Sequence, residues 1–531
     1  MTQHSDTHEF DSFLCLDSKS NKMKQLIINV LLFCTFFLGT ETLSAQTKLP
    51  SILSDNMCLQ QSSDVKIWGW DNPGQTIIVK PSWTKAEKTE TSKAGKWFVT
   101  TSTPKAGKTG TIKVTGSSQQ IIKNIVFGEV WLCSGQSNME RELGFHRGQK
   151  PIVNFWEESQ KANYPQIRMF QVPKVPSDTP LFDCEGKWVE CSPESVLEFS
   201  AVGYFYGKAL YDKLNIPVGL IQSAWGGTPV EPWTPEDDYE KVTKEKIIKL
   251  EQSYQIDSSY YFHALKNYKE GTISNSPIMP ESVVYQKRVH KKLAALYNGM
   301  ISPLINYCIK GAIWYQGESN VPNWKEYKTL FPNMITSWRE KWGIGDFPFY
   351  FVQIAPNNYT DKFGQPQIVE AQCEALKLPN TGVAATQDIG AIYDIHPPQK
   401  KEVGRRLSLV ALNKTYGKTN VVYSGPFLSS YKNEGENLVL QFVTPGSELQ
   451  STGIAIGGIW AFYIAGENKI FYKAMVKQEE NQILLSSPKV QNPVAVRYNW
   501  ANNANATIYN KQGLPALPFR TDDWDEVYYG D

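Results

Sequence analysis

This sequence of 531 residues has no excess of charge of one sign, no cluster of metal-ligating residues and no internal repeat. Its 54 basic and 53 acidic residues nearly cancel, and no long run of like charge occurs. Proteins that bind nucleic acid or an anionic membrane surface usually carry basic stretches, so neither partner is expected. No CxxC pair and no cluster of His and Cys is present, so nothing in the sequence indicates a zinc site.

Cysteine is also sparse, with eight residues in the whole chain. Six of them follow residue 45, namely Cys58, Cys133, Cys184, Cys191, Cys308 and Cys373. Cys133 and Cys308 adjoin apolar runs and are expected as buried thiols. Cys184 and Cys191 flank residues 185–190 and could close a small disulfide loop in an exported protein.

Residues 1–45 have the pattern of an export signal. The basic stretch Lys22–Lys24 precedes the apolar run Leu26–Gly39, and small residues follow. Because this run is short for a membrane span, we expect a signal peptide that is cleaved at its C-terminal end. The mature chain is then periplasmic or secreted, with no membrane segment. Residues 1–22 are polar and unusual in a signal, so Met23 is a candidate true start, and an uncleaved anchor is the alternative.

The remaining chain changes character twice. Residues 46–125 hold short alternating runs such as Val65–Trp70, which predicts an N-terminal β domain of the sandwich kind. Residues 126–417 alternate apolar runs with helical patterns, which predicts an α/β domain with a mostly parallel sheet covered by helices. Residues 418–531 return to strand-like runs such as Leu438–Val443, so a C-terminal β region is expected.

Polar residues follow every strand expected in the α/β domain. These strands are Glu129–Cys133, Val218–Gln222, Ile309–Tyr315, Pro348–Ile354 and Val383–Thr386. Helical patterns cover Phe199–Leu214, Val289–Ile305, Trp324–Trp342 and Val369–Leu376. Ligands bind at the carboxyl ends of parallel strands, so the functional site is expected at this edge of the sheet. Residues 234–288 and 357–367 show no readable pattern and are expected as loops that set specificity.

Ser137 is the best candidate for a catalytic nucleophile. It follows the first of these strands and Gly135, in the sequence Gly-Gln-Ser-Asn, so its hydroxyl is expected at a strand-to-helix turn. This sequence differs from the Gly-x-Ser-x-Gly elbow of α/β-hydrolases, and a lone Gly-x-Ser is weak evidence. The position at a strand end, together with the motifs below, favours Ser137.

The shortage of histidine narrows the choice of a general base. The histidines after residue 45 are His146, His263, His290 and His396. His396 is followed by two prolines and by a helical pattern with the apolar stripe Val403, Leu407, Val410 and Ala411. Since proline presets a first helical turn, His396 is expected on a rigid loop, as suits a general base. Surface or packing roles explain His263 and His290, and His146 could line the site.

An acyl-transfer site also needs fixed N–H donors for the oxyanion. The candidates are the backbone of Ser137, the backbone of Gly226 or Gly227, and the side-chain amide of Gln316. Glycine lets the backbone approach a substrate closely. A plain tight turn at the two glycines and a buried structural amide at Gln316 are the alternative interpretations.

Long segments of the chain resemble the sialate O-acetylesterase family, which belongs to the SGNH hydrolase group and contains carbohydrate acetylesterases. They are Gly128–Glu140, Ser223–Trp233, Trp314–Asn320 and Asp394–Pro397, with Leu53–Met57 and Gly513–Asp522 near the two ends. The resemblance covers nearly all of the mature chain. It implies an SGNH-hydrolase-like parallel sheet covered by helices and a serine esterase that removes acetyl groups from carbohydrates.

The resemblance also implies roles for individual residues. Ser137 matches the nucleophile, His396 the base, and Gly227 with Gln316 the oxyanion hole. The expected mechanism forms an acyl-enzyme on Ser137 and releases the acetyl group with water, and it requires neither a metal nor an organic cofactor.

The acid that orients the histidine has three candidates. The wider SGNH pattern places an aspartate three residues before the histidine, where this chain has Tyr393. Asp394, one residue later, is the first candidate, and Asp388 and Glu318 are the other two.

Asn138, Trp225 and Trp314 are expected to line the substrate site, and the indole rings of the two tryptophans suit the apolar faces of sugars.

Two alternatives to an esterase remain. A glycoside hydrolase would use two carboxylates roughly 5 to 10 Å apart, for which the chain has Glu140, Glu231 and Glu318. A non-catalytic glycan-binding protein would use a platform of Trp225, Trp233 and Trp314. The sugar, the acetyl position and the oligomeric state stay open.

Overall fold

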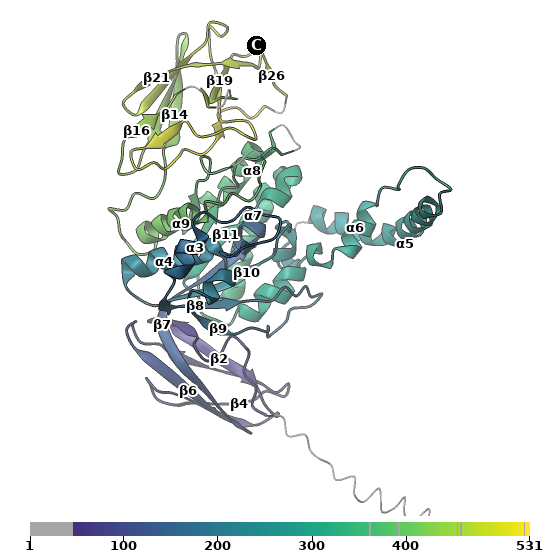
Figure 1. The fold of residues 1–531 in the computed structure, drawn as a ribbon, viewed down its shortest axis with the longest axis vertical. Coiled ribbons are helices and arrows are strands. Elements are labelled where there is room, and N and C mark those ends of the chain that lie inside the picture. Colours follow the sequence, from purple (N-terminus) through teal and green to yellow (C-terminus); the bar gives the residue numbers. More distant parts are fainter. Residues whose placement is uncertain are drawn as a thin grey trace, which may run out of the picture. The chain divides into compact units, whose positions relative to one another are not determined.

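One long strand connects the N-terminal part of the protein to its central sheet (Figure 1). The computed structural model describes residues 46–530 except 240, 360–362, 391–392, 454, 457–458 and 525. The expected signal peptide therefore lies outside the described residues. Strand β7 (Gln119–Gly135) pairs with β6 (Thr109–Thr115) in its first part and with the central strands in its second part. The domain boundary expected after residue 125 thus falls inside a continuous strand.

The central sheet is mixed only at one edge. Its strand order is β13-β12-β11-β7-β10-β8-β9, and every neighbouring pair is parallel except β8 with β9. The other strands are β8 (Tyr164–Gln171), β9 (Trp188–Cys191), β10 (Val218–Ala224), β11 (Gly311–Tyr315), β12 (Phe349–Val352) and β13 (Thr381–Ala384). All residues of β10, β11 and β12 are buried, because helices cover both faces of the sheet.

Two helices cover each face. On one face of the sheet, α4 (Ala201–Leu214) and α9 (Lys400–Lys414) share a core with one alternating set of residues of β7 and β11. On the other face, α7 (Trp324–Trp342) and α8 (Gly364–Cys373) pack on the alternate residues of the same strands. Ser200 caps α4 by accepting the Gly203 N–H at 3.0 Å, as short hydroxyl side chains do at helix starts.

Two β-rich regions flank the α/β part. The N-terminal strands are β1 (Cys58–Gln60), β2 (Asp64–Trp70), β3 (Thr76–Pro81), β4 (Glu87–Glu90), β5 (Lys96–Ser102) and β6. The C-terminal strands are β14 (Phe427–Glu434), β15 (Asn437–Val443), β16 (Leu449–Ser451), β17 (Ala455–Ile456), β18 (Ile459–Trp460), β19 (Phe462–Ala465), β20 (Ile470–Lys473), β21 (Met475–Glu479), β22 (Gln482–Ser486), β23 (Ala495–Tyr498), β24 (Ile508–Asn510), β25 (Phe519–Arg520) and β26 (Tyr528–Tyr529). The protein is therefore a mixed α/β structure with additional β-rich regions.

Three details of the α/β part differ from the sequence predictions. Residues 234–288 were expected as a loop, but they contain α5 (Lys241–Lys269) and α6 (Glu281–Lys287). The helix expected over Val289–Ile305 is broken into short 3-10 and π-helical segments, with a proline at residue 303. The antiparallel strands β8 and β9 were not predicted from the sequence. Short helices α2 (Ser137–Glu140) and α3 (Phe155–Gln160) complete the α/β part.

All six described cysteines are free thiols. Cys191 packs in the core under α4, whereas Cys184 packs against the core of the opposite face. A disulfide loop between these two residues is therefore not formed. In the described part of the chain, no helix is both long and apolar enough to span a bilayer.

Candidate active site

The turn after β7 places Ser137 at the carboxyl edge of the central sheet. Strand β7 ends at Gly135, whose φ of 137° is a left-handed value and whose missing Cβ would otherwise clash with the carbonyl of Tyr315. Gln136 then donates its N–H to that carbonyl at 3.0 Å, and Ser137 is the first residue of α2. Glycine at residue 135 thus lets the chain turn sharply and present the serine hydroxyl.

His396 lies on the loop between β13 and α9, beside this serine. Its Nε2 is 2.9 Å from the Oγ of Ser137, which is hydrogen-bonding distance for a nucleophile and its base. Burial lowers the pKa of His396, and the nearby Lys400 cation lowers it further. The negative charge of Asp394 acts in the opposite direction. The imidazole is therefore biased toward its neutral form, in which it can accept a proton.

The three candidate carboxylates occupy different environments. Asp394 accepts the backbone N–H of His396 at 2.9 Å through Oδ1, and its Oδ2 lies 3.6 Å from Nζ of Lys150. Glu318 is buried and accepts from the amide of Asn138 at 2.6 Å. Among the described residues, none of the three carboxylates is hydrogen-bonded to Nδ1 of His396.

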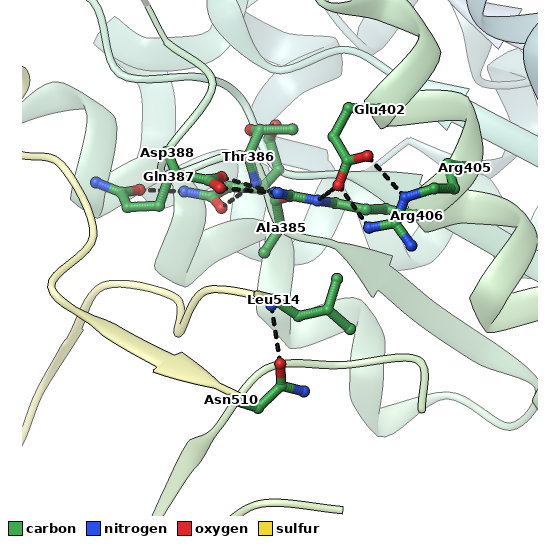
Figure 2. A network of polar contacts seen from close by, with 10 residues as sticks. Ala385, Thr386, Gln387, Asp388, Glu402, Arg405, Arg406, Asn510 and Leu514 are labelled. Carbon is green, nitrogen blue, oxygen red and sulfur yellow. Dashed lines mark hydrogen bonds and ion pairs between the residues drawn. The ribbon is translucent and has the colours of Figure 1, made fainter. Parts of the chain in front are cut away.

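Asp388, near the start of the same loop, belongs to a polar network with Arg406 of α9. Figure 2 shows its carboxylate facing the guanidinium of Arg406, with bonds of 2.7 and 2.8 Å. Arg406 also donates to Glu402 and to the carbonyl of Ala385, each at 2.7 Å. Because both oxygens of Asp388 are occupied by Arg406, its geometry is that of a structural ion pair.

The two expected oxyanion glycines differ in their surroundings. The N–H of Gly226 donates to Oε2 of Glu140, and a Cβ at this position would come within 3.1 Å of the Ser137 Cβ. Gly227 has a φ of 70° and open space where a Cβ would project. Within the described structure, the backbone N–H groups of Ser137 and Gly227 have no protein acceptor. They are therefore available to a ligand atom at the site.

Gln316 lies one residue beyond β11 and is fully buried. Its amide nitrogen donates to the carbonyl of Thr228 at 3.3 Å and to Oδ1 of Asn320 at 2.7 Å. Its Oε1 accepts the hydroxyl of Tyr327 at 2.9 Å. The amide thus ties the segments that follow β10 and β11 to helix α7.

A pocket of about 320 Å³ opens over Ser137. Trp225 forms part of its wall, and the indole is stacked on His290 with ring centroids 4.8 Å apart. Glu140 also lines the pocket and pairs with Lys174. The sequence predicted Trp225 here but assigned His290 only a surface or packing role. No signal in its helical pattern placed it beside a strand-end tryptophan.

Two residues expected to line the substrate site lie in the interior instead. Trp314 is 0% exposed and packs edge-on against Trp233 and Trp338 in the aromatic core under α7. Asn138 is also 0% exposed. Side chains on alternate residues of β11 point to opposite faces of the sheet, so Trp314 points into a core and cannot reach a sugar. The platform of Trp225, Trp233 and Trp314 is excluded for the same reason.

Sequence reasoning missed a buried lysine next to the site. Lys400 is 0% exposed, and its Nζ donates to Oδ1 of Asn138. Burial lowers its pKa to about 7. A signal was present in the helical spacing, because Lys400 precedes Val403 by three residues and Leu407 by seven. This spacing places it on the buried stripe of α9.

The chain is similar to carbohydrate esterases along most of its length. A family model described as "Carbohydrate esterase, sialic acid-specific acetylesterase" matches residues 127–262 and 268–412. Sialate O-acetylesterase of Homo sapiens is 30% identical over 419 residues, which cover 71% of this chain and 73% of the human protein. The Mus musculus enzyme is 30% identical over 527 residues, or 89% and 94% of the two chains. A carbohydrate acetylesterase from Xanthomonas citri superposes with a TM-score of 0.76 at 32% identity, covering 90% of this chain and all of that one.

Proposed function

Because the chain belongs to the sialic acid-specific acetylesterase family of carbohydrate esterases, we propose that it removes acetyl groups through Ser137 as nucleophile and His396 as base. The activity class, a carbohydrate O-acetylesterase, follows from the family. The observation that carries the residue assignment is the 2.9 Å contact between Nε2 of His396 and Oγ of Ser137, a residue that lines the pocket. The family's SGNH arrangement of the sheet is part of the same proposal.

In the first half of the reaction, Nε2 of His396 accepts the proton of Ser137 while Oγ attacks the acetyl carbonyl carbon. The carbonyl oxygen becomes negatively charged and is bound by the backbone N–H groups of Ser137 and Gly227. His396 then gives its proton to the departing sugar hydroxyl. This leaves an acetyl ester on Ser137, which is the acyl-enzyme.

In the second half, His396 accepts a proton from water, and the resulting hydroxide attacks the acetyl ester on Ser137. Acetate leaves, and the serine regains its proton. Gln316 was expected to donate to the oxyanion, but both of its amide bonds are directed to Thr228 and Asn320. We therefore assign Gln316 the support of the strand ends, and a direct bond to the oxyanion would require one of these bonds to break.

Asp394 is the proposed orienting acid. It fixes the backbone of His396 by accepting its N–H, and its charge favours the imidazolium that forms during attack. Asp388 is the less suitable of the alternatives, because Arg406 occupies both of its oxygens. Glu318 acts through Asn138, as developed below.

The proposed substrate is an O-acetylated carbohydrate of the sialate, xylan or mannan type. The named relatives are sialate O-acetylesterases and a carbohydrate acetylesterase, and the pocket offers the exposed part of Trp225 for an apolar sugar face. Export through the N-terminal signal would bring the enzyme to such glycans outside the cytoplasm.

The test is acetate release from 4-nitrophenyl acetate, acetylated xylan and O-acetylated sialic acid, with the wild type, Ser137→Ala and His396→Ala. We expect activity to be lost in both variants and the substrate ranking to identify the sugar. A fluorophosphonate probe should label the wild type at Ser137 and leave Ser137→Ala unlabelled. Unchanged acetate release by Ser137→Ala would reject Ser137 as the nucleophile, and sugar release without acetate release by the wild type would favour the glycoside hydrolase alternative.

A further inference from the structure

Asn138 joins the segment that carries the nucleophile to the segment that carries the base. It directly follows Ser137, and its Nδ2 donates to the carbonyl of Ile395, the residue before His396, at 2.9 Å. We propose that Asn138 is a positioning residue for ester hydrolysis, and that the buried pair of Lys400 and Glu318 holds its amide in the required orientation. This inference rests on the proposed roles of Ser137 and His396.

Every polar atom of the Asn138 side chain has a protein partner. Besides its bond to the carbonyl of Ile395, Nδ2 donates to Oε1 of Glu318 at 2.6 Å. Its Oδ1 accepts from Nζ of Lys400. An amide has two N–H donors and one carbonyl oxygen, so these three bonds leave no N–H for a substrate. The 0% exposure of Asn138 agrees with a role inside the protein rather than in substrate binding.

The two partners come from different elements that meet under the site. Glu318 begins the short turn Glu318–Asn323 after β11, and Lys400 begins α9, four residues after His396. The ammonium of Lys400 also lies 5.1 Å from the ring centre of Tyr315, the last residue of β11. The network therefore links the ends of β7 and β11 with the start of α9.

Stability alone does not explain why Lys400 and Glu318 are both buried beside Asn138. Lys400 and Glu318 form no direct ion pair in the described structure, and each binds the side chain of Asn138 instead. Burying charged groups costs free energy, and groups of opposite charge offset that cost only when they pair closely. Glu318 also has a second oxygen, Oε2, that is buried without a hydrogen-bond partner in the described structure. A costly arrangement next to a reacting serine is expected where orientation matters more than stability.

Lys400 also acts on the base electrostatically. The charged and titratable groups that face His396 are Lys400, Arg141, His146 and Asp394. The first three favour the neutral imidazole, and only Asp394 favours the charged form. Glu318 faces Lys400 and stabilises its cation. A neutral substitute for Lys400 should therefore change the pH at which His396 loses its proton.

The first test compares Asn138→Ala with Asn510→Ala. Asn510 is equally buried and donates to the carbonyl of Ser424 at 3.0 Å in the C-terminal β region, so it controls for the loss of a buried amide. We expect Asn138→Ala to lower kcat on 4-nitrophenyl acetate about 100-fold, as small misplacements of reacting groups do, with KM within about threefold. Asn510→Ala should leave kcat unchanged. A raised KM with unchanged kcat in Asn138→Ala would overturn the proposal.

The second test is the pH profile of Lys400→Gln, which keeps a donor but removes the charge. Because the Lys400 cation lowers the pKa of His396, the acid limb of kcat/KM should move to higher pH in this variant. Lys400 is cationic in this range, since its own pKa of about 7 lies above the acid limb. An acid limb at the wild-type position would overturn the electrostatic part of the proposal.

The third test is a rescue of the contact between residues 138 and 318, with kcat expressed per folded molecule so that a change in stability alone does not count. Asn138→Asp places a carboxylate against that of Glu318, whereas adding Glu318→Gln supplies a new donor to it. We expect the double variant to recover kcat at least about 10-fold over Asn138→Asp, as coupled neighbours do. Because an aspartate cannot donate to the carbonyl of Ile395, only the contact with residue 318 is remade in the double variant. No recovery would overturn the role of Glu318 in holding the side chain of residue 138, even if Asn138→Ala failed to fold. Activity retained in Ser137→Ala, measured in parallel, would instead reject the proposed function itself.

Discussion

Oγ of Ser137 and Nε2 of His396 are separated by 259 residues of sequence and lie 2.9 Å apart in the structure. The serine directly follows the end of β7, and the histidine lies on the loop that connects β13 of the same sheet to α9. The sheet brings these two segments together at one edge, and each can be changed by a substitution that leaves the other unaltered.

Removal of the Ser137 hydroxyl should abolish ester hydrolysis. Without it no acyl-enzyme can form, and loss of a nucleophile typically lowers kcat by about 10⁴-fold or more. Acetate release by Ser137→Ala measures this. Ser134→Ala is the matched control, because its hydroxyl lies three residues earlier on β7 and is buried without a hydrogen-bond partner in the described structure. A comparable loss in both variants would indicate damage to β7 rather than removal of a nucleophile.

The acid limb of the kcat/KM profile should lie below the ordinary histidine pKa of about 6.5. His396 acts as a base only when neutral, and burial with the Lys400 cation lowers its pKa. Activity should therefore persist at mildly acidic pH and fall as pH drops through the lowered pKa. Initial rates at subsaturating substrate across pH 4 to 8 give the profile. A limb above pH 6.5 would contradict this assignment of the base.

Loss of the Glu140 carboxylate should loosen the turn that presents Gly227. Glu140 accepts the N–H of Gly226, and Lys174 pairs with the same carboxylate. We expect Glu140→Ala to lower kcat about 10-fold through poorer oxyanion binding, and Glu140→Gln, which keeps an acceptor oxygen, to lose less. Equal losses in the two variants would show that the charge, and not the hydrogen bond to Gly226, is what matters.

Asp388 should prove important for stability rather than for catalysis. Arg406 is 4% exposed and binds Asp388 with two hydrogen bonds (Figure 2). Asp388→Asn removes one of the two carboxylates that bind this buried guanidinium and leaves Glu402, which should lower the free energy of unfolding by about 1.5 to 3 kcal/mol. Urea unfolding measures the change, and kcat per folded molecule should stay near wild type. A 100-fold loss of kcat with unchanged stability would identify Asp388 as the orienting acid instead.

Trp225 should contribute to carbohydrate affinity. Its indole lines the pocket over Ser137 and is held by stacking on His290. We expect Trp225→Ala to raise KM about 10-fold on an acetylated carbohydrate, since a lost aromatic contact is worth about 1.4 kcal/mol. KM for 4-nitrophenyl acetate should change less, because this substrate has no sugar ring to stack. An equal change for both substrates would contradict a sugar-binding role.

Much of the fold and the core of the candidate site could be predicted from local patterns. Five apolar runs followed by polar residues indicated the parallel strands, and each expected strand overlaps an observed one. The scarcity of histidine and the two prolines after His396 singled out this residue as base. Resemblance to a family in the same segments predicted the activity class. This was possible because each motif is a contiguous stretch of sequence that can be recognised without the structure.

Tertiary structure alone decided which side chains face the pocket and which face the interior. Asn138 adjoins the nucleophile in sequence, yet its side chain points into a buried network with Glu318 and Lys400. Trp314 lies in a conspicuous motif but packs in the core. His290, from a segment predicted to be helical, stacks on Trp225. These placements depend on contacts between residues far apart in the chain, and local sequence periodicity carries no information about such partners.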